Sequence, residues 1–435
     1  MVRSALSEKA HESSIDVFSM NLEKLLLQPP MKDKVILGFD PAFRTGCKLA
    51  VIDASGKKLT VDVIYPHQPN AKVRESEQKL VQLCKEYHVN LIAIGNGTAS
   101  RESEAFVANT IKKFNLPVSY TIVSEAGASV YSASKLAIEE FPDLHVEQRS
   151  AISIARRLMD PLSELIKIDP QSIGVGQYQH DLPTARLKER LDFVVTKAVN
   201  RVGVNVNTAS SELLKNISGL SAATAKSIVT YREDHGEIRN RIELKQIPKV
   251  GAKSFEQAAG FLRIEDGDEP LDRTSIHPES YALAKKILAQ FALTPSMMGS
   301  EEARASLEKV TSSALAKELG ADVYTIEDIL DAIRSPLRDY RERYDAPILR
   351  SDVLELEDLH IGDELEGVVR NVVDFGAFVD IGLHEDGLVH ISKMRRQRVQ
   401  HPSEVVAVGD VVKVWVYNID QEKQKVQLSL LPLQK

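Results

Sequence analysis

Two acidic side chains stand directly after apolar runs in the first half of this sequence of 435 residues. Asp40 follows the run 35–39, and Glu125 follows the run 118–123. Carboxylates at strand ends can hold the divalent cations that assist phosphate-ester hydrolysis, whereas a simpler role is to cap a turn or a helix end. The sequence contains no nucleophile elbow, P-loop, HExxH pair or dinucleotide-binding glycine pattern. Asp40 and Glu125 are therefore the candidate catalytic residues, and we expect neither a bound metal nor a cofactor.

A second group of candidates combines aromatic and basic side chains near the C-terminal end. Bases of single-stranded nucleic acid stack on aromatic rings, at about 1–3 kcal/mol per base, while cationic side chains hold the phosphates. Strand alternation puts Phe378 on the face of Asp380 and opposite to Ala377, which favours an exposed ring. Core rings beside a solvated basic loop are the alternative. The candidate RNA-binding residues are Phe375, Phe378, His390, Lys393, Arg395, Arg396 and Arg398.

A third group lies in a pattern that occurs twice within residues 207–263: a helical segment, a tight apolar turn with glycine, and a second helix. Both copies resemble helix-hairpin-helix motifs, in which backbone N–H groups of the turn and of the following helix grip a phosphate. Ser221 replaces one glycine of the first turn, and Lys249 replaces one glycine of the second. A purely structural helical repeat is the alternative. The candidate phosphate-binding residues are Gly219, Ser221, Lys226, Lys249, Gly251 and Lys253.

Composition limits the class of protein that must position these residues. Hydrophobic residues make up 43% of the chain and charged residues 27%, which excludes general disorder. No apolar run is long enough to cross a membrane, and the polar N-terminal stretch lacks the apolar core of a secretory signal. Two cysteines far apart cannot form a zinc cluster, and a cytoplasmic location is expected. The net charge of −7 argues against a uniformly basic surface but permits local basic sites.

Apolar periodicity divides the chain into an α/β part, an all-α part and an all-β part. Strands and helices alternate after three meandering strands, which is typical of a mixed α/β sheet. Helical patterns fill most of the middle of the chain, and five short strands with glycine turns then fit an OB-type barrel. The expected parts are a helical segment at 1–31, an α/β domain at 32–160, a connector at 161–206, the paired turns at 207–265, a helical connector at 266–350 and the barrel at 351–435.

The α/β part resembles the RNase H-like fold, in its RuvC and YqgF resolvase branch, because an acid ends its first strand before a glycine turn. Nucleases of that fold gather about four carboxylates around two Mg²⁺ ions. Here the fourth strand runs into Gly-Asn-Gly-Thr at 95–98, and the last helix has Arg149 or Ser150 where an acid belongs. Asp181 is the nearby substitute. The resemblance thus predicts a degenerate domain without nuclease activity.

The barrel is similar to the S1 RNA-binding domain over about 70 residues, through its segments 374–379 and 387–392. In that family the residues that match Phe375, Phe378 and His390 touch nucleotides. An RNase H-like domain, paired helix-hairpin-helix motifs, a helical connector and an S1 domain follow one another as in the Tex family of bacterial transcription accessory proteins. The stretches that resemble signatures of that family are 94–102, 205–210 and 277–281.

Members of the family carry a further helical N-terminal part, so we expect this chain to be a C-terminal portion. The resemblance implies a transcription accessory factor without chemistry of its own, which binds single-stranded RNA, with DNA and the transcription machinery as further partners and no membrane. A metal-dependent, structure-specific nuclease or resolvase is the alternative. A ribosome-associated RNA factor would differ from the first only in its partner. The number of carboxylates around Asp40 distinguishes these hypotheses: two would favour a nucleic-acid-binding factor, and four would favour a nuclease.

Overall fold

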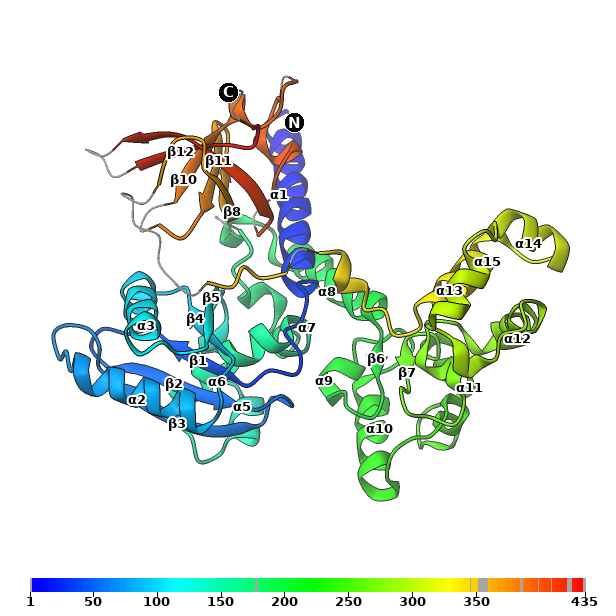
Figure 1. The fold of residues 1–435 in the computed structure, drawn as a ribbon. Coiled ribbons are helices and arrows are strands. Elements are labelled where there is room, and N and C mark those ends of the chain that lie inside the picture. The colour runs from blue at the N-terminus through cyan, green and yellow to red at the C-terminus, as the bar shows by residue number, and fades with distance from the viewer. Residues whose placement is uncertain are drawn as a thin grey trace. The chain divides into compact units, whose positions relative to one another are not determined.

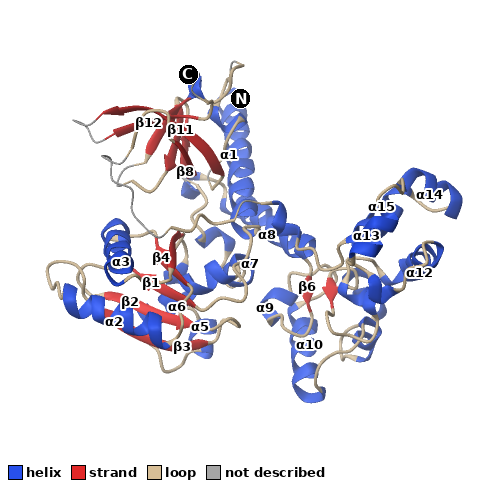
Figure 2. Ribbon diagram, viewed as in Figure 1, coloured by secondary structure: helices blue, strands red, loops and turns tan. Residues whose placement is uncertain are grey.

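The computed structural model describes residues 2–176, 179–344, 346–350, 359–383, 386–397, 399–407, 409–420 and 425–432. The chain forms two compact units, one of Met1–Leu191 with Tyr344–Lys435 and one of Asp192–Arg343. The first unit holds a mixed sheet and a closed barrel, and the second is helical with one short strand pair (Figure 1, Figure 2). The predicted combination of α/β, all-α and all-β parts is confirmed.

A five-stranded sheet in the order β3-β2-β1-β4-β5 forms the centre of the α/β part. β1 pairs antiparallel with β2 and parallel with β4, and β4 pairs parallel with β5. The carboxyl ends of β1, β4 and β5 therefore lie at the same edge of the sheet. The strands are β1 (Ile36–Asp40), β2 (Cys47–Ile52), β3 (Lys58–Ile64), β4 (Leu91–Gly95) and β5 (Ser119–Val123).

Helices cover both faces of this sheet because its central strands are apolar on both sides. Leu37 packs with Leu80 and Val107 on one face, whereas Ile36 packs with Ala155 on the other. Two short helices follow β5 in place of a single longer one, since the Ser134 side chain caps a new helix. The helices of this unit are α1 (Val2–Leu26), α2 (Val73–Glu86), α3 (Ser100–Phe114), α4 (Ala128–Ser132), α5 (Lys135–Glu140), α6 (Val146–Met159), α7 (Pro161–Leu165) and the first part of α8 (Thr184–Val202), which continues into the second unit.

The C-terminal barrel closes in the strand order β10-β12-β11-β8-β9. Its interior is filled by alternate apolar residues of the strands, including Val369, Val379, Val389, Val414 and Leu428. The strands are β8 (Glu364–Val373), β9 (Gly376–Asp380), β10 (Gly387–His390), β11 (Val411–Asp420) and β12 (Lys425–Ser429). The five strands expected from the glycine-punctuated sequence are all present.

The second unit is built around a buried arginine. The Arg241 guanidinium donates hydrogen bonds to the carbonyl oxygens of Leu262, Thr274 and Ile276 and to the Tyr281 hydroxyl, at 2.6–2.7 Å. It thereby joins the paired turns to the helices that follow them. The elements of this unit are β6 (Val204–Asn205), α9 (Ser211–Leu214), α10 (Ala222–His235), η3 (Arg241–Gln246), α11 (Ala252–Ala258), β7 (Leu262–Arg263), α12 (Tyr281–Gln290), α13 (Glu301–Leu307), α14 (Ser312–Leu319) and α15 (Val323–Arg334).

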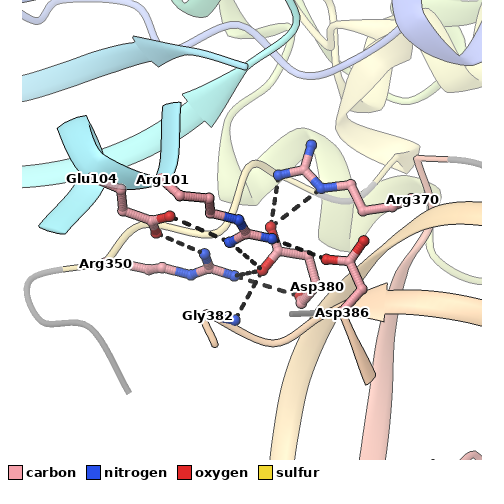
Figure 3. A network of polar contacts seen from close by, with 7 residues as sticks. All are labelled: Arg101, Glu104, Arg350, Arg370, Asp380, Gly382 and Asp386. Carbon is pink, nitrogen blue, oxygen red and sulfur yellow. Dashed lines mark hydrogen bonds and ion pairs between the residues drawn. The ribbon is translucent and has the colours of Figure 1, made fainter. Parts of the chain in front are cut away.

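A network of ion pairs within the first unit joins α3 to the barrel (Figure 3). Asp380 is 1% exposed and accepts hydrogen bonds from Arg350 at 3.2 Å and from Arg370 at 2.6 Å. Arg350 also reaches Glu104 of α3, and Arg101 of α3 reaches Asp386 at 3.0 Å. Burial alone would raise the pKa of Asp380, but these guanidinium groups lower it to about 2.

No helix among the described residues is long and apolar enough to cross a lipid bilayer.

Candidate nucleic-acid interface

The outer face of the barrel carries the predicted aromatic residues. Phe378 of β9 lies opposite Leu388 of β10, while their neighbours Ala377 and Val389 point into the core. Phe375 is 52% exposed, and its ring lies 6.2 Å from that of Phe378, centroid to centroid, at an angle of 87°. This edge-to-face pair offers an open ring surface on which a base could stack.

His390 ends β10, and the predicted basic residues follow it in the sequence. His390 is exposed, and its Nδ1 lies 2.9 Å from the Ser392 hydroxyl. Arg395 and Arg396 are exposed, as a phosphate-binding role requires. Arg398 lies outside the described residues.

Tyr417 joins this face and was missed by the sequence reasoning. The Lys393 ammonium group lies 3.9 Å from the centroid of the Tyr417 ring, which is a cation–π contact. A bulge in β11 between Val416 and Asn418 interrupts the pairing with β12. Strict alternation would not place both Tyr417 and Asn418 outward, but the bulge leaves both exposed. A third aromatic ring thus lies beside a predicted cation.

The reason given for the exposure of Phe378 was partly wrong. Asp380 does share the strand face of Phe378, but it is buried, because Arg350 and Arg370 cover it. Phe378 itself is only partly exposed, whereas Phe375 is the open ring. The two rings nevertheless form one pair, with Phe375 as its accessible member.

The two turns of the second unit have the same backbone geometry. Leu220 N–H donates to the carbonyl of Ile217 at 3.0 Å, and Val250 N–H donates to that of Ile247 at 3.1 Å. Gly219 has φ +85°, and Lys249 has φ +71° at the equivalent position. Lys249 therefore adopts a left-handed conformation that glycine adopts without strain. The predicted correspondence between the turns is confirmed by their conformation.

The two turns differ in whether a side chain already accepts a hydrogen bond from the backbone N–H groups at the start of the following helix. The Ser221 hydroxyl accepts from Thr224 N–H at 3.2 Å and so caps α10. Gly251 begins α11 without any side-chain cap, and a Cβ at Gly251 would meet no atom within 4 Å. Its neighbour Lys253 is exposed. Of the two turns, the second is therefore the more open to a phosphate.

A cleft of about 400 Å³ in this unit brings two of the predicted lysines together. Lys226 of α10 and Lys249 of the second turn both line it. The stacked rings of Tyr231 and His235, with centroids 4.4 Å apart, line the same cleft. By contrast, Gly219 faces α11, where a Cβ would come within 2.6 Å of Gln257. Gly219 thus has a packing reason to be glycine besides any contact with phosphate.

The carboxyl edge of the sheet holds more acidic groups than the sequence indicated. Asp40 at the end of β1 is acted on by Glu125 and also by Glu147 of α6. Glu147 was missed because only Arg149 and Ser150 were considered for the start of this helix, whereas α6 begins at Val146. Burial raises the pKa of Asp40 to about 6, and the two glutamates act in the same direction. Asp181 is exposed and lies in the separate turn η2 (Gln179–Asp181).

Glu125 occupies the place of the acid that β4 lacks. A Cβ at Gly97 would lie 1.7 Å from Glu125 Oε1, and one at Gly95 would lie 2.7 Å from Oε2. The Gly97 N–H donates to this carboxylate, and Asn96 Oδ1 accepts from the Glu125 N–H at 3.0 Å. The two glycines are therefore needed to admit the side chain. Burial raises the pKa of Glu125, although the nearby Arg157 opposes the rise.

Basic and hydroxyl groups complete this edge. Lys48 pairs across the strands with Asp40, is buried, and lies 3.8 Å from the Glu147 carboxylate. The Ser150 side chain hydrogen-bonds to Asp40, whereas Arg149 turns away and donates to the carbonyls of Phe141 and Ser132. Ser150, not Arg149, is thus the residue beside Asp40. Among the described residues, no group of three acidic, histidine or cysteine side chains is arranged to hold a metal ion.

Four family models match the chain. They are the Tex protein YqgF-like domain at residues 34–159, the helix-hairpin-helix motif at 199–263, the HHH domain at 269–341 and the S1 RNA binding domain at 358–431. The order of these domains agrees with the order predicted from the sequence motifs.

Curated relatives match almost the whole chain. It is 56% identical over 430 residues to the uncharacterized protein YdcI of Bacillus subtilis, which covers 99% of this chain and 60% of that protein. It is 48% identical over 429 residues to the transcriptional accessory protein Tex of Neisseria gonorrhoeae, with coverages of 98% and 55%. It is 37% identical over 489 residues to human S1 RNA-binding domain-containing protein 1, with coverages of 99% and 49%.

The chain thus spans 49% to 60% of the length of these relatives. It carries a YqgF-like domain, helix-hairpin-helix elements and an S1 domain in a single sequence, and relatives named Tex align along 98% of it. The chain belongs to the Tex family.

Proposed function

We propose that this chain binds nucleic acid as part of a transcription accessory factor of the Tex type and catalyses no hydrolysis. Single-stranded RNA binds on the outer face of the barrel, and a phosphate of RNA or DNA binds at the second helix-hairpin-helix turn. The name of the Neisseria relative supports the role in transcription. The S1 and helix-hairpin-helix domains support the binding of nucleic acid.

One observation carries the proposal for RNA: an exposed aromatic ring beside cationic groups. Phe375 is 52% exposed, although burying a phenylalanine would stabilise the fold. Tyr417, with Lys393 over its ring, adds a second exposed aromatic to the same barrel. Binding of a single strand needs two features: aromatic rings on which bases stack, and cationic side chains that attract the phosphates.

Nuclease activity is the competing function, and the donor set at the sheet edge argues against it. Glu125 and Glu147 both act on Asp40 there, but so does the ammonium group of Lys48, which lies 3.8 Å from the Glu147 carboxylate. A fixed cation repels Mg²⁺, and it also neutralises the negative charge of the carboxylates that would attract Mg²⁺. The end of β4 also supplies glycine and asparagine in place of an acid. We therefore assign the edge a structural role.

The proposal is tested by fluorescence anisotropy with labelled single-stranded RNA, single-stranded DNA and duplex, at salt concentrations between about 50 and 200 mM. Single strands should bind better than the duplex and with little base preference. Replacing Arg395 and Arg396 together by glutamine should flatten the slope of log affinity against log salt by about 1.4. Replacing the exposed Arg74 and Arg338 instead is the matched control and should leave the slope unchanged.

An unchanged slope in the Arg395 and Arg396 variant would show that these side chains contact no phosphate. Incubation of the same substrates and of four-way junctions with Mg²⁺ or Mn²⁺ tests the competing function. We expect no cleavage. Cleavage that disappears in Asp40→Asn would establish a nuclease and overturn the assignment.

A further inference from the structure

The cleft of about 400 Å³ in the second unit has features that the binding of a phosphate does not explain. Residues spaced four apart lie on one face of a helix. Four such residues of α10 line the cleft: Ala223, Ser227, Tyr231 and His235. Pro248 and Lys249 of the second turn line it as well. We name this site the α10 cleft, and two of its residues are aromatic.

The rings of Tyr231 and His235 form a stack that is held in place from both sides. Their centroids lie 4.4 Å apart, and the angle between the ring planes is 13°. The Tyr231 hydroxyl donates to the Glu243 carboxylate at 3.2 Å, and the His235 Nδ1–H donates to the backbone carbonyl of Tyr231 at 3.1 Å. Because the rings are already ordered, stacking of a further ring on them costs less conformational entropy.

The outer ring of this stack is accessible to a ligand. His235 is exposed and lines the cleft. The helix ends directly after it at Gly236, where a Cβ would meet no atom within 4 Å. A planar group that enters the cleft can therefore reach the His235 ring.

Two cations of the same cleft have no acidic partner. Lys226 of α10 and Lys249 are exposed, and neither forms an ion pair among the described residues. By contrast, Lys215 near the first turn pairs with Glu212. Asp234 is the acid of the cleft and lies eight positions after Lys226, which is about 12 Å along the helix axis. A phosphate thus fits the Lys226 end of the cleft, and the aromatic stack lies towards the other end.

We propose that the α10 cleft binds one unpaired nucleotide of a nucleic-acid strand, with its base on His235 and its phosphate against Lys226 and Lys249. This rests on the proposed function, in which a phosphate binds at the second turn, and adds the base to that site. A base within a duplex is stacked between its neighbours, so only an unpaired base can stack on a protein ring. The volume of the cleft is within the range of small-molecule sites.

Anisotropy titrations of the whole chain with two labelled DNA hairpins test the proposal. Both hairpins end in a single unpaired nucleotide, which carries adenine in one hairpin and is abasic in the other, so that both keep the same phosphates. We expect the adenine hairpin to bind the wild type about 5-fold to 150-fold more tightly, which is the range for one stacked base. Equal affinities of the two hairpins would overturn the proposal.

Three variants locate the base. His235→Ala should abolish the preference for the adenine hairpin, whereas His235→Phe keeps a ring and should keep the preference. Phe375→Ala should keep it too, because that ring belongs to the barrel and not to the cleft. Melting temperatures verify that each variant is folded. A preference that survives in folded His235→Ala, or that disappears in Phe375→Ala, would overturn the proposal, because the base would then stack elsewhere.

Lys226→Gln and Lys249→Gln separate the failure of this inference from the failure of the proposed function. Each variant should weaken the binding of both hairpins, because both carry the phosphates. If the wild type does not distinguish the hairpins but these variants still weaken them, the nucleotide site falls and the phosphate site stands. If these variants have no effect, both fall.

An acidic peptide is the competing occupant of the α10 cleft, because its carboxylates could also pair with the two lysines. A glutamate-rich peptide that binds the wild type, while neither hairpin binds, would assign the cleft to an acidic protein and overturn the proposal.

Discussion

Replacing Asp40 by asparagine should stabilise the protein at alkaline pH. Burial raises the pKa of Asp40 from 3.8 to about 6. The protonated form is therefore favoured in the folded state, so the stability contributed by this group is complete below about pH 4 and is lost as the pH rises through 6. Each pKa unit corresponds to about 1.4 kcal/mol, which gives an upper value of about 3 kcal/mol at pH 8.

Asparagine has no charge to desolvate, so Asp40→Asn should raise the free energy of unfolding by up to about 3 kcal/mol at pH 8 and by about half as much at pH 5. Urea denaturation at both pH values measures the difference. Asp53 is the matched control, because its hydrogen bonds with Ser55 and Lys57 lower its pKa despite partial burial. Asp53→Asn should therefore destabilise the protein at pH 8. An Asp40→Asn variant that is no more stable than the wild type at pH 8 would refute the reasoning.

The remaining predictions concern the second turn and the ion-pair network. Lys249→Gly should raise the free energy of unfolding by up to about 1 kcal/mol, because φ +71° strains a residue with a side chain, and should weaken nucleic-acid binding; a less stable variant in urea denaturation would contradict this. Gly251→Val should weaken nucleic-acid binding in anisotropy titrations while the melting temperature stays nearly constant, since the added side chain meets open space; a large drop in melting temperature would instead indicate a structural role. Asp380→Asn should lower the free energy of unfolding by about 3–5 kcal/mol at neutral pH, because Arg350 and Arg370 lose their buried partner. Because the folded-state pKa of Asp380 is about 2, this loss should shrink only as the pH falls from 4 through 2, and equal stability at pH 7 would argue against the network.

Features set by local sequence were predictable. Apolar runs and glycine turns located the sheet and the barrel, because the side-chain period of a strand is a local property. The equivalence of Gly219 and Lys249 could be aligned from the sequence, and their positive φ values agree with that alignment. Phe375, which is 52% exposed, was named from the resemblance to the S1 domain, whereas the argument from strand alternation concerned Phe378 alone.

Other features were missed, one of them because it is set by contacts between distant segments. Glu147 belongs to the first turn of α6, and the start of that helix depends on a hydrogen bond from the His145 N–H to Gln148 at 3.0 Å. Tyr417 lies on the strand face opposite to the buried Val414 and Val416, so strand alternation could have found it, but the prediction did not apply alternation to this strand. The sequence also gave no sign that Asp380 is buried, because its arginine partners are brought to it by the fold.

The lack of partners for two donors of Arg157 likewise depends on three-dimensional packing. Nothing in the sequence around Arg157 distinguishes it from its neighbours Arg156 and Arg149. Arg156 pairs with Glu140 at 2.7 Å, and Arg149 donates to two backbone carbonyls. Only the position of each side chain relative to the sheet separates an arginine with bonded donors from one whose Nε and Nη2 have no partner among the described residues.

The central claim, that the outer face of the barrel binds single-stranded RNA, is tested most directly by the affinity of Phe375→Ala. Because Phe375 is 52% exposed, the substitution should leave the barrel folded. Loss of one stacked base predicts a dissociation constant about 5-fold to 150-fold higher than that of the wild type at any salt concentration. Tyr324→Ala, which removes a 77% exposed ring from α15, should leave the affinity unchanged. An unchanged dissociation constant in a folded Phe375→Ala variant would contradict the account.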